Sequence, residues 1–191
     1  MLLLTARTAA ADTFRTVALS GQAAPGANPG ESFGPFAFND QFYGVTLNEH
    51  GRVAFRGNLT NTGLANDSGL WSEGNGSLSL LARDGTAADG TMPGTLFGAG
   101  LFTPILNDLG QTAFYGYIDD PTPGQNDEPA IWTNYGPAST ALIVLEGTPA
   151  PGTSGDLGDL ITTIHFNTAG NTAFTAYLSG PGPEIGTRPG V

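Results

Sequence analysis

Two histidines and several acidic loops hold most of the side chains in this sequence that could do chemistry. Histidine is the usual general base in enzymes, because its unperturbed pKa lies near neutrality. His50 and His165 lie far apart in the sequence, and no Gly-x-Ser-x-Gly motif accompanies them. We therefore assign no catalytic residue, and the sequence favours a protein that is not an enzyme.

The acidic segment IDDPTPGQNDEP, residues 118–129, offers the best material for a metal site. Its carboxylates supply the hard oxygen ligands that calcium prefers, and extracellular modules often bind calcium weakly. The segment does not match an EF-hand loop, and Asp-Pro pairs are also ordinary turn sequences. Solvated turns are the favoured interpretation, with calcium as the one cofactor to test. The candidate ligands are Asp119, Asp120, Asp127 and Glu128.

Aromatic residues form a second candidate site. Tyr115, Tyr117 and Tyr177 occupy positions whose counterparts elsewhere in the chain vary, so we expect an exposed face that could bind a glycan or a protein ligand. Trp71 and Trp132 instead recur at matching positions, and core packing explains them better.

An eight-residue frame, Asn-x-x-Gly-x-x-Ala-Phe, occurs at 48–55, 107–114 and 167–174, with spacings of 59 and 60 residues. Asparagine can hydrogen-bond its own backbone two residues on, and glycine accepts the positive φ of a type I turn closed by a bulge. We interpret the frame as a turn followed by the start of a strand. The turn residues are Asn48, Gly51, Asn107, Gly110, Asn167 and Gly170, and the core residues are Phe55, Phe114, Phe174, Trp71 and Trp132.

The segments around each frame predict short antiparallel strands. Apolar stretches at 42–47, 101–106 and 161–166 precede the turns, and segments that alternate with period two follow them. Third strands are expected around Trp71 and Trp132, and fourth strands in SLSLLARDG and ALIVLEG. Residues 17–27 match a fourth strand and its Gly-rich bend.

Four strands in a unit of about 60 residues favour an all-β fold of β-propeller-like blades that form an incomplete ring. A threefold β-trefoil or β-prism is the alternative. Residues 16–178 are predicted to form a single β-repeat domain. Residues 1–15 are interpreted as a leader remnant or disordered N-terminus, and residues 179–191 as a Gly/Pro-rich tail.

Charge and composition exclude several partners. The chain has 17 acidic and 6 basic residues, so it lacks the basic surface that nucleic acids require. No apolar run approaches the roughly 18 residues of a membrane helix, so no membrane insertion is expected. Self-association, or further blades from a longer chain, would complete the ring.

The repeated frame resembles that of bacterial choice-of-anchor tandem-repeat proteins that contain the NxxGxxAF motif. The resemblance covers about residues 17–178 and implies export to the cell surface, without an established activity. We expect an extracellular or surface-attached structural or ligand-binding module. A fragment of a propeller hydrolase or lyase, or a carbohydrate-binding module, is the alternative.

Overall fold

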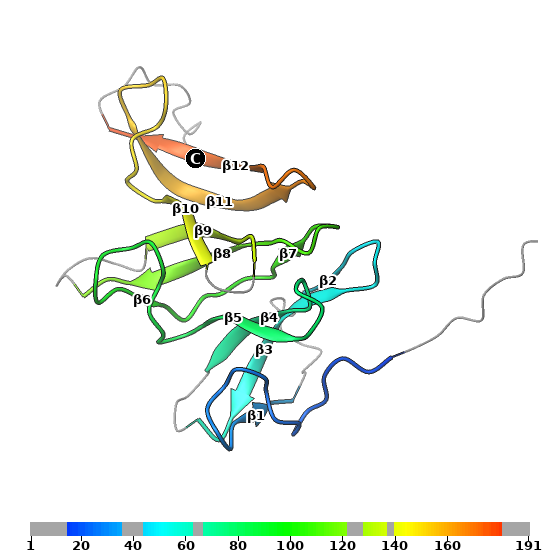
Figure 1. The fold of residues 1–191 in the computed structure, drawn as a ribbon. Coiled ribbons are helices and arrows are strands. Elements are labelled where there is room, and N and C mark those ends of the chain that lie inside the picture. Colours follow the sequence, from blue (N-terminus) through cyan, green and yellow to red (C-terminus); the bar gives the residue numbers. More distant parts are fainter. Residues whose placement is uncertain (1–14, 36–43, 63–66, 122–127, 137–139, 181–191) are drawn as a thin grey trace, which may run out of the picture.

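The computed structural model describes residues 15–35, 44–62, 67–121, 128–136 and 140–180, and these residues form an all-β fold. Three antiparallel sheets follow one another along the chain (Figure 1). Within the described residues, no helix has the length and apolar character needed to cross a lipid bilayer. The predicted leader remnant up to residue 14, and the tail from residue 181, lie outside the described residues.

The first sheet is built around the strand that follows the first Asn-x-x-Gly turn. This strand, β3 (Val53–Thr60), pairs on one edge with two short strands, β1 (Ser32–Phe33) and β2 (Val45–Leu47). On its other edge lies β4 (Ser68–Ser72), which in turn pairs with β5 (Ser79–Arg83). The expected hairpin, third strand and fourth strand are therefore all present.

The second sheet has the same strand order. Its central strand β8 (Thr112–Asp119) pairs on one edge with β6 (Leu96–Phe97) and β7 (Ile105–Leu106), and on the other with β9 (Glu128–Asn134) and then β10 (Thr140–Leu145). The third sheet is a hairpin of β11 (Asp156–Phe166) and β12 (Thr172–Ser179). There one long strand takes the edge that two short strands share in the other sheets.

All three Asn-x-x-Gly segments form the predicted turn. Gly51, Gly110 and Gly170 have φ values of 72°, 84° and 81°, which only glycine adopts at little cost. In the first turn the amide of Gly51 donates to the carbonyl of Asn48 at 3.1 Å, and the amide of His50 donates to Oδ1 of Asn48 at 3.0 Å. The geometry of the turn thus explains why asparagine and glycine recur at these positions of the frame.

The start of the described chain departs from expectation. Residues 17–19, which match a fourth strand in sequence, belong to no strand, although the bend that follows them does form at Gly21 and Gly26. Val17 and Ala18 pack instead against the aromatic core of the first sheet.

Each complete sheet has a tryptophan at the centre of its core. Trp71 lies 4.9 Å from Phe33 between ring centroids, and Trp132 lies 5.0 Å from Phe97. Each indole also holds the preceding Gly-rich loop, because Trp71 Nε1 donates to Pro25 O at 2.9 Å and Trp132 Nε1 to Asp89 O at 3.1 Å. Both tryptophans are fully buried, which confirms the core prediction.

Successive sheets pack face against face. Leu70 and Ala82 of the first sheet join Phe114 and Trp132 of the second in one buried cluster. The opposite face of the second sheet, with Ile131 and Val144, packs against Ile164 and Phe174 of the third. Phe55 and Phe114 are buried as expected, whereas Phe174 is only half-buried.

The frame asparagines also connect the sheets to one another. Nδ2 of Asn48 donates to the backbone carbonyl of Asn107 at 3.0 Å, and Nδ2 of Asn107 donates to that of Asn167 at 2.8 Å. Oδ1 of each asparagine accepts an amide of its own turn four residues on, at 2.9–3.0 Å. We call this series of bonds the asparagine ladder. It fixes the register of neighbouring sheets at their turn ends.

Small residues allow the ladder to form. Ala54 and Ala113 are fully buried, and Ser72 Oγ lies 3.0 Å from Thr112 Oγ1 across the junction between the first two sheets. A Cβ atom on Gly110 would lie 2.1 Å from the carbonyl oxygen of Gly74. A side chain there would therefore force the first two sheets apart.

We predict that Asn107→Asp destabilises the protein by about 2–4 kcal/mol in urea unfolding at pH 7. A carboxylate keeps the turn acceptor but loses the donor bonds to Asn167 O and to Gln111 Oε1, at 2.8 and 2.7 Å. Each such bond contributes about 1 kcal/mol, and a buried group left without its partner costs more.

Asn167→Asp is the matched control, because Asn167 is exposed and its Oδ1 bond to the amide of Asn171 survives the change. Its cost should stay below about 1 kcal/mol. Equal losses in the two variants would show that the asparagine acts only within its own turn.

Candidate functional site

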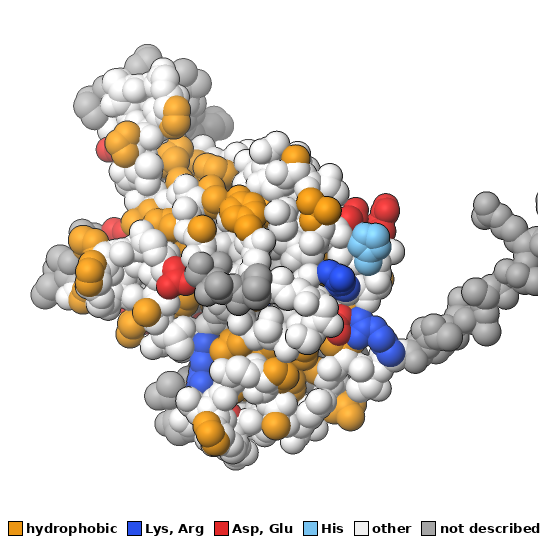
Figure 2. Space-filling model, viewed as in Figure 1, with side chains coloured by type: hydrophobic (Ala, Val, Ile, Leu, Met, Phe, Trp, Pro, Cys, Tyr) orange, Lys and Arg blue, Asp and Glu red, His pale blue; other side chains and the backbone are white. Residues whose placement is uncertain are grey.

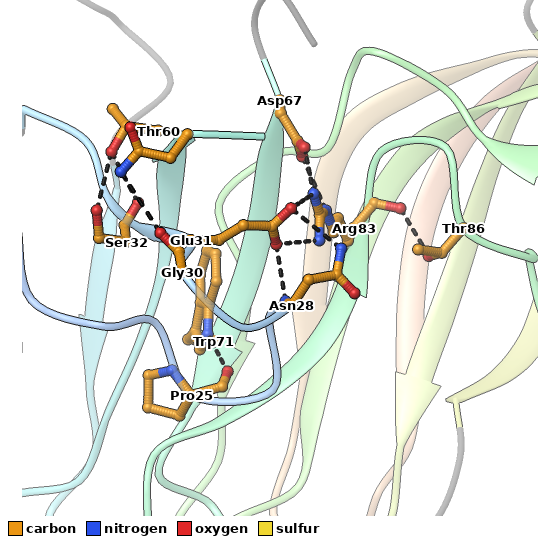
Figure 3. A network of polar contacts seen from close by, with 11 residues as sticks. Pro25, Asn28, Gly30, Glu31, Ser32, Thr60, Asp67, Trp71, Arg83 and Thr86 are labelled. Atoms are coloured by element: carbon orange, nitrogen blue, oxygen red, sulfur yellow. Dashed lines mark hydrogen bonds and ion pairs between the residues drawn. The ribbon is translucent and has the colours of Figure 1, made fainter. Parts of the chain in front are cut away.

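The clearest cluster of charged side chains is centred on Arg83, at the end of β5 (Figure 3). Its guanidinium donates to both carboxylate oxygens of Glu31, at 2.6 and 2.9 Å, and its Nε donates to Oδ1 of Asp67 at 3.0 Å. All three residues are buried, with 3–8% of their surface exposed. We call these residues, with Asn28, the Arg83 network.

The network connects three separate segments of the first sheet. Glu31 lies immediately before β1, and Asp67 immediately before β4. Asn28 adds two bonds to the Glu31 carboxylate, from its amide at 2.8 Å and its Nδ2 at 3.0 Å. The arrangement therefore fastens the loop before β1, whose Pro25 carbonyl accepts from Trp71, onto the ends of β4 and β5.

The electrostatics of the network favour charged, paired groups. Hydrogen bonds from Arg83 lower the pKa of Glu31 to about 2, against the opposing effect of burial, and bonds to Asp67 and Glu31 raise the pKa of Arg83. Arg83 directs both edges of its guanidinium at carboxylates, which is the bidentate geometry that gives strong pairs. The network acts as an internal clamp, and its charged groups are turned away from solvent.

Asp84 follows Arg83 and has the opposite electrostatic behaviour. Burial raises its pKa to about 6, although Ser68 donates to its Oδ2 from the hydroxyl at 2.8 Å and from the amide at 3.2 Å. Its other carboxylate oxygen is buried and has no hydrogen-bond partner among the described residues. Burial therefore disfavours the ionised form of the Asp84 carboxyl in the folded protein.

Sequence reasoning missed the Arg83 network, although one signal was available. Aligning Gly34 with Gly98 and Gly85 with Gly147 places Thr95 opposite Glu31 and Leu145 opposite Arg83 in the second sheet. Arg83 also follows an apolar run, LSLLA, where a charge is unexpected. The Arg83 network therefore has no counterpart at the matching positions of the second sheet. The sequence signal for it is a charged residue at a position where the second sheet has an apolar one.

The acidic residues proposed as calcium ligands are not assembled into a site among the described residues. Asp119 is exposed, Asp120 and Glu128 are half-buried, and Asp127 lies outside the described residues. Burial, together with the charge of Asp120, raises the pKa of Glu128, so these two carboxylates are close enough to interact. The described part of the chain holds no group of three metal-ligating side chains. Calcium binding stays a prediction.

The three tyrosines do not form one exposed face. Tyr115 is only 3% exposed and lies 5.0 Å from Phe102 and 5.6 Å from Tyr117 between ring centroids. The expectation of exposure is wrong for Tyr115, because the third sheet covers this side of the second. Tyr177 lies on β12 and is 52% exposed. Figure 2 shows hydrophobic side chains gathered where the third sheet meets the second.

The two histidines are exposed and belong to different elements. His50 lies in the first turn, and His165 lies near the end of β11. Neither belongs to a group of three metal-ligating residues within the described ranges. The structure thus brings neither of them to the Arg83 network or to the acidic segment.

We expect Arg83→Met to cost about 3–5 kcal/mol of unfolding free energy in urea at pH 7, because it leaves Glu31 and Asp67 buried without a counter-charge. The triple variant Glu31→Thr, Asp67→Asn, Arg83→Leu removes all three charges together and should recover most of this loss. If Arg83→Met unfolds at the wild-type urea concentration, the network does not hold the loop.

The two shifted carboxyls predict opposite responses to pH. The pKa of Glu31 is lowered from 4.5 to about 2, so its contribution to stability is present above pH 4.5 and is lost as the pH falls towards 2. The pKa of Asp84 is raised from 3.8 to about 6, so its ionisation destabilises the fold above pH 6, and this penalty disappears by about pH 4.

Asp84→Asn should therefore stabilise the protein at pH 7.5, by on the order of 2 kcal/mol, and this advantage should vanish near pH 4. Urea unfolding of both proteins at half-unit pH steps measures the difference. A difference that does not change with pH would contradict the assignment.

Comparison with known proteins gives a family but no activity. A family model described as a family of unknown function, DUF7453, matches residues 4–139, which include the first sheet and the second up to the start of β10. No curated protein and no solved structure matches the chain. The match covers well over half of the sequence, so the chain belongs to the DUF7453 family of unknown function.

Proposed function

We propose that the chain is an exported, non-enzymatic tandem-repeat module that serves as a structural or ligand-binding element at a bacterial cell surface. The asparagine ladder carries this proposal. The asparagine that recurs in the frames joins neighbouring sheets in two of the three, through the bonds from Asn48 to Asn107 and from Asn107 to Asn167. Recurring residues that hold sheets together favour a structural role for the chain over a catalytic one.

The remaining charges support the same conclusion. Arg83 and its two carboxylates pair with one another inside the first sheet, where all three are buried, so this cluster offers no accessible acid, base or nucleophile. Catalysis needs such groups within hydrogen-bond reach of a bound substrate. An inward-facing network stabilises the sheet that carries it.

We propose further that each sheet is a propeller-like blade. The strand order β1-β3-β4-β5, with each strand antiparallel to its neighbour, is that of a four-stranded meander, and β2 extends the edge that β1 occupies. Sheets that stack face to face around an axis are the arrangement of propeller blades. The resemblance of the frame to exported NxxGxxAF proteins supports location at the cell surface.

Protease treatment of intact bacterial cells that produce the protein tests the proposed location. We expect an antibody raised against residues 15–180 to lose its signal on intact cells, while a cytoplasmic marker is preserved. Digestion only after the cells are lysed would contradict surface exposure. The Asn107→Asp variant should be digested faster than Asn167→Asp, because a weakened junction opens more often.

A further inference from the structure

Equivalent residues at the two ends of the stack differ in exposure from those inside it. Asn48 and Asn107 are 7% and 5% exposed, and Ala54 and Ala113 are fully buried. In the third sheet, the matching Asn167 and Ala173 are both exposed. These positions are covered in the first two sheets because the next sheet packs on them.

At the opposite end of the stack, the first sheet exposes apolar residues that are buried in the other sheets. Val45 and Leu47 of β2 are each 67% exposed. Leu106 of the second sheet, which matches Leu47, is 7% exposed, and Ile164 of the third sheet, which matches Val45, is 8% exposed. The first sheet therefore presents an apolar edge that the other two bury against the sheet before them.

The turn glycines show the same difference. A Cβ atom on Gly110 would meet Gly74 of the preceding sheet, and one on Gly170 would lie 3.1 Å from Tyr135 of the preceding sheet. A Cβ atom on Gly51 would meet nothing within 4 Å. The space in front of the first turn is thus open, although the Arg15 guanidinium donates to the Gly51 carbonyl from the side at 2.6 Å.

The asparagine ladder has a direction. Each asparagine donates through Nδ2 to the carbonyl of the next asparagine along the chain. The exposed amide of Asn167 is therefore the donor end, and the carbonyl of Asn48 lies at the acceptor end. We name the donor end the tail face (His165, Asn167, Ala173 and Tyr177) and the acceptor end the head face (Val45, Leu47 and Gly51).

We propose that the tail face of one chain docks on the head face of a second copy, so that the inter-sheet junction is repeated between molecules. In this contact Asn167 Nδ2 of one copy donates to the Asn48 carbonyl of the other. Val45 and Leu47 then become buried, as Leu106 and Ile164 are within the chain. The proposal goes beyond the proposed function by giving the module a partner.

A second copy is the occupant that the structure favours, because the contact continues a geometry that the chain already uses twice. The two faces are different surfaces, so the contact is heterologous and leaves one head and one tail free. Such contacts grow into rings or filaments, depending on the rotation between copies. Binding should be driven mainly by burial of apolar surface, with the ladder bond setting the register.

Like charge on the two copies opposes the contact. Each chain carries a formal net charge of -11, and the resulting repulsion extends over roughly 10 Å at 0.1 M salt. An apolar junction closed by a neutral hydrogen bond should therefore tighten as salt is added. A contact held by ion pairs would weaken.

Sedimentation velocity on the purified 191-residue chain, from micromolar to millimolar concentration at 0.15 and 0.5 M NaCl, tests the proposal. We expect the mean mass to rise with concentration and the apparent dissociation constant to fall at least threefold at the higher salt. A monomer at every concentration would overturn the proposal, and so would association that weakens with salt.

Two variants identify the faces. Leu47→Glu places a charge on the head face, and Ala173→Arg blocks close approach at the tail face. Both positions are exposed in the single chain, so both variants should keep the wild-type unfolding temperature, which is the control for folding. Each variant alone should stay monomeric, since it retains only one working face.

An equimolar mixture of the two variants should form a one-to-one dimer and grow no further, because the tail of Leu47→Glu can meet the head of Ala173→Arg. A mixture that stays monomeric, or variants that still associate alone, would exclude head-to-tail docking. Either result leaves the surface-digestion test unaffected, so failure of this contact is distinguishable from failure of the proposed function.

Discussion

The stack depends on one constraint: Asn48 and Asn107 must each satisfy their own turn and also reach the next sheet. Oδ1 of Asn107 accepts the amide of Gln111, while its Nδ2 donates to the carbonyl of Asn167. An aspartate could do the first but not the second, and a serine is too short to do both. The sheets can then approach only if the neighbouring side chain is small, which explains the alanines at 54 and 113.

The two complete sheets share some stabilising contacts and differ in others. Both use a buried tryptophan to hold a Gly-rich loop, and both place an aromatic partner about 5 Å from it between ring centroids. At the far end of that loop, the first sheet relies on Glu31 and Arg83, whereas the second has Thr95 and Leu145. Charged and apolar solutions thus occupy equivalent places, in line with the small net benefit of buried ion pairs.

The sequence allowed the local structure to be predicted, because turns and strands depend on neighbouring residues. The positive φ at Gly51 and the pairing of Val45–Leu47 with β3 follow from the frame alone. Contacts between distant segments do not. Nothing near Tyr115 in the sequence indicates that the third sheet covers it, and Glu31 and Arg83 are separated by 52 positions. For the same reason the sequence predicts the role of the asparagines in their turns but not their bonds between sheets.

Comparison of the third sheet with the second shows which features of a strand come from the frame and which come from the sheets packed beside it. β12 repeats the Ala-Phe start of β8 and pairs with β11 through a ladder that has two register shifts. Its first six residues alternate between half-buried and exposed, whereas five successive residues of β8 are buried. The second sheet packs against the first sheet on one face and the third on the other, whereas the third sheet packs only against the second among the described residues, and this cover accounts for the difference. The frame thus determines the turn and the strand that follows it, while the burial of that strand depends on the neighbouring sheets.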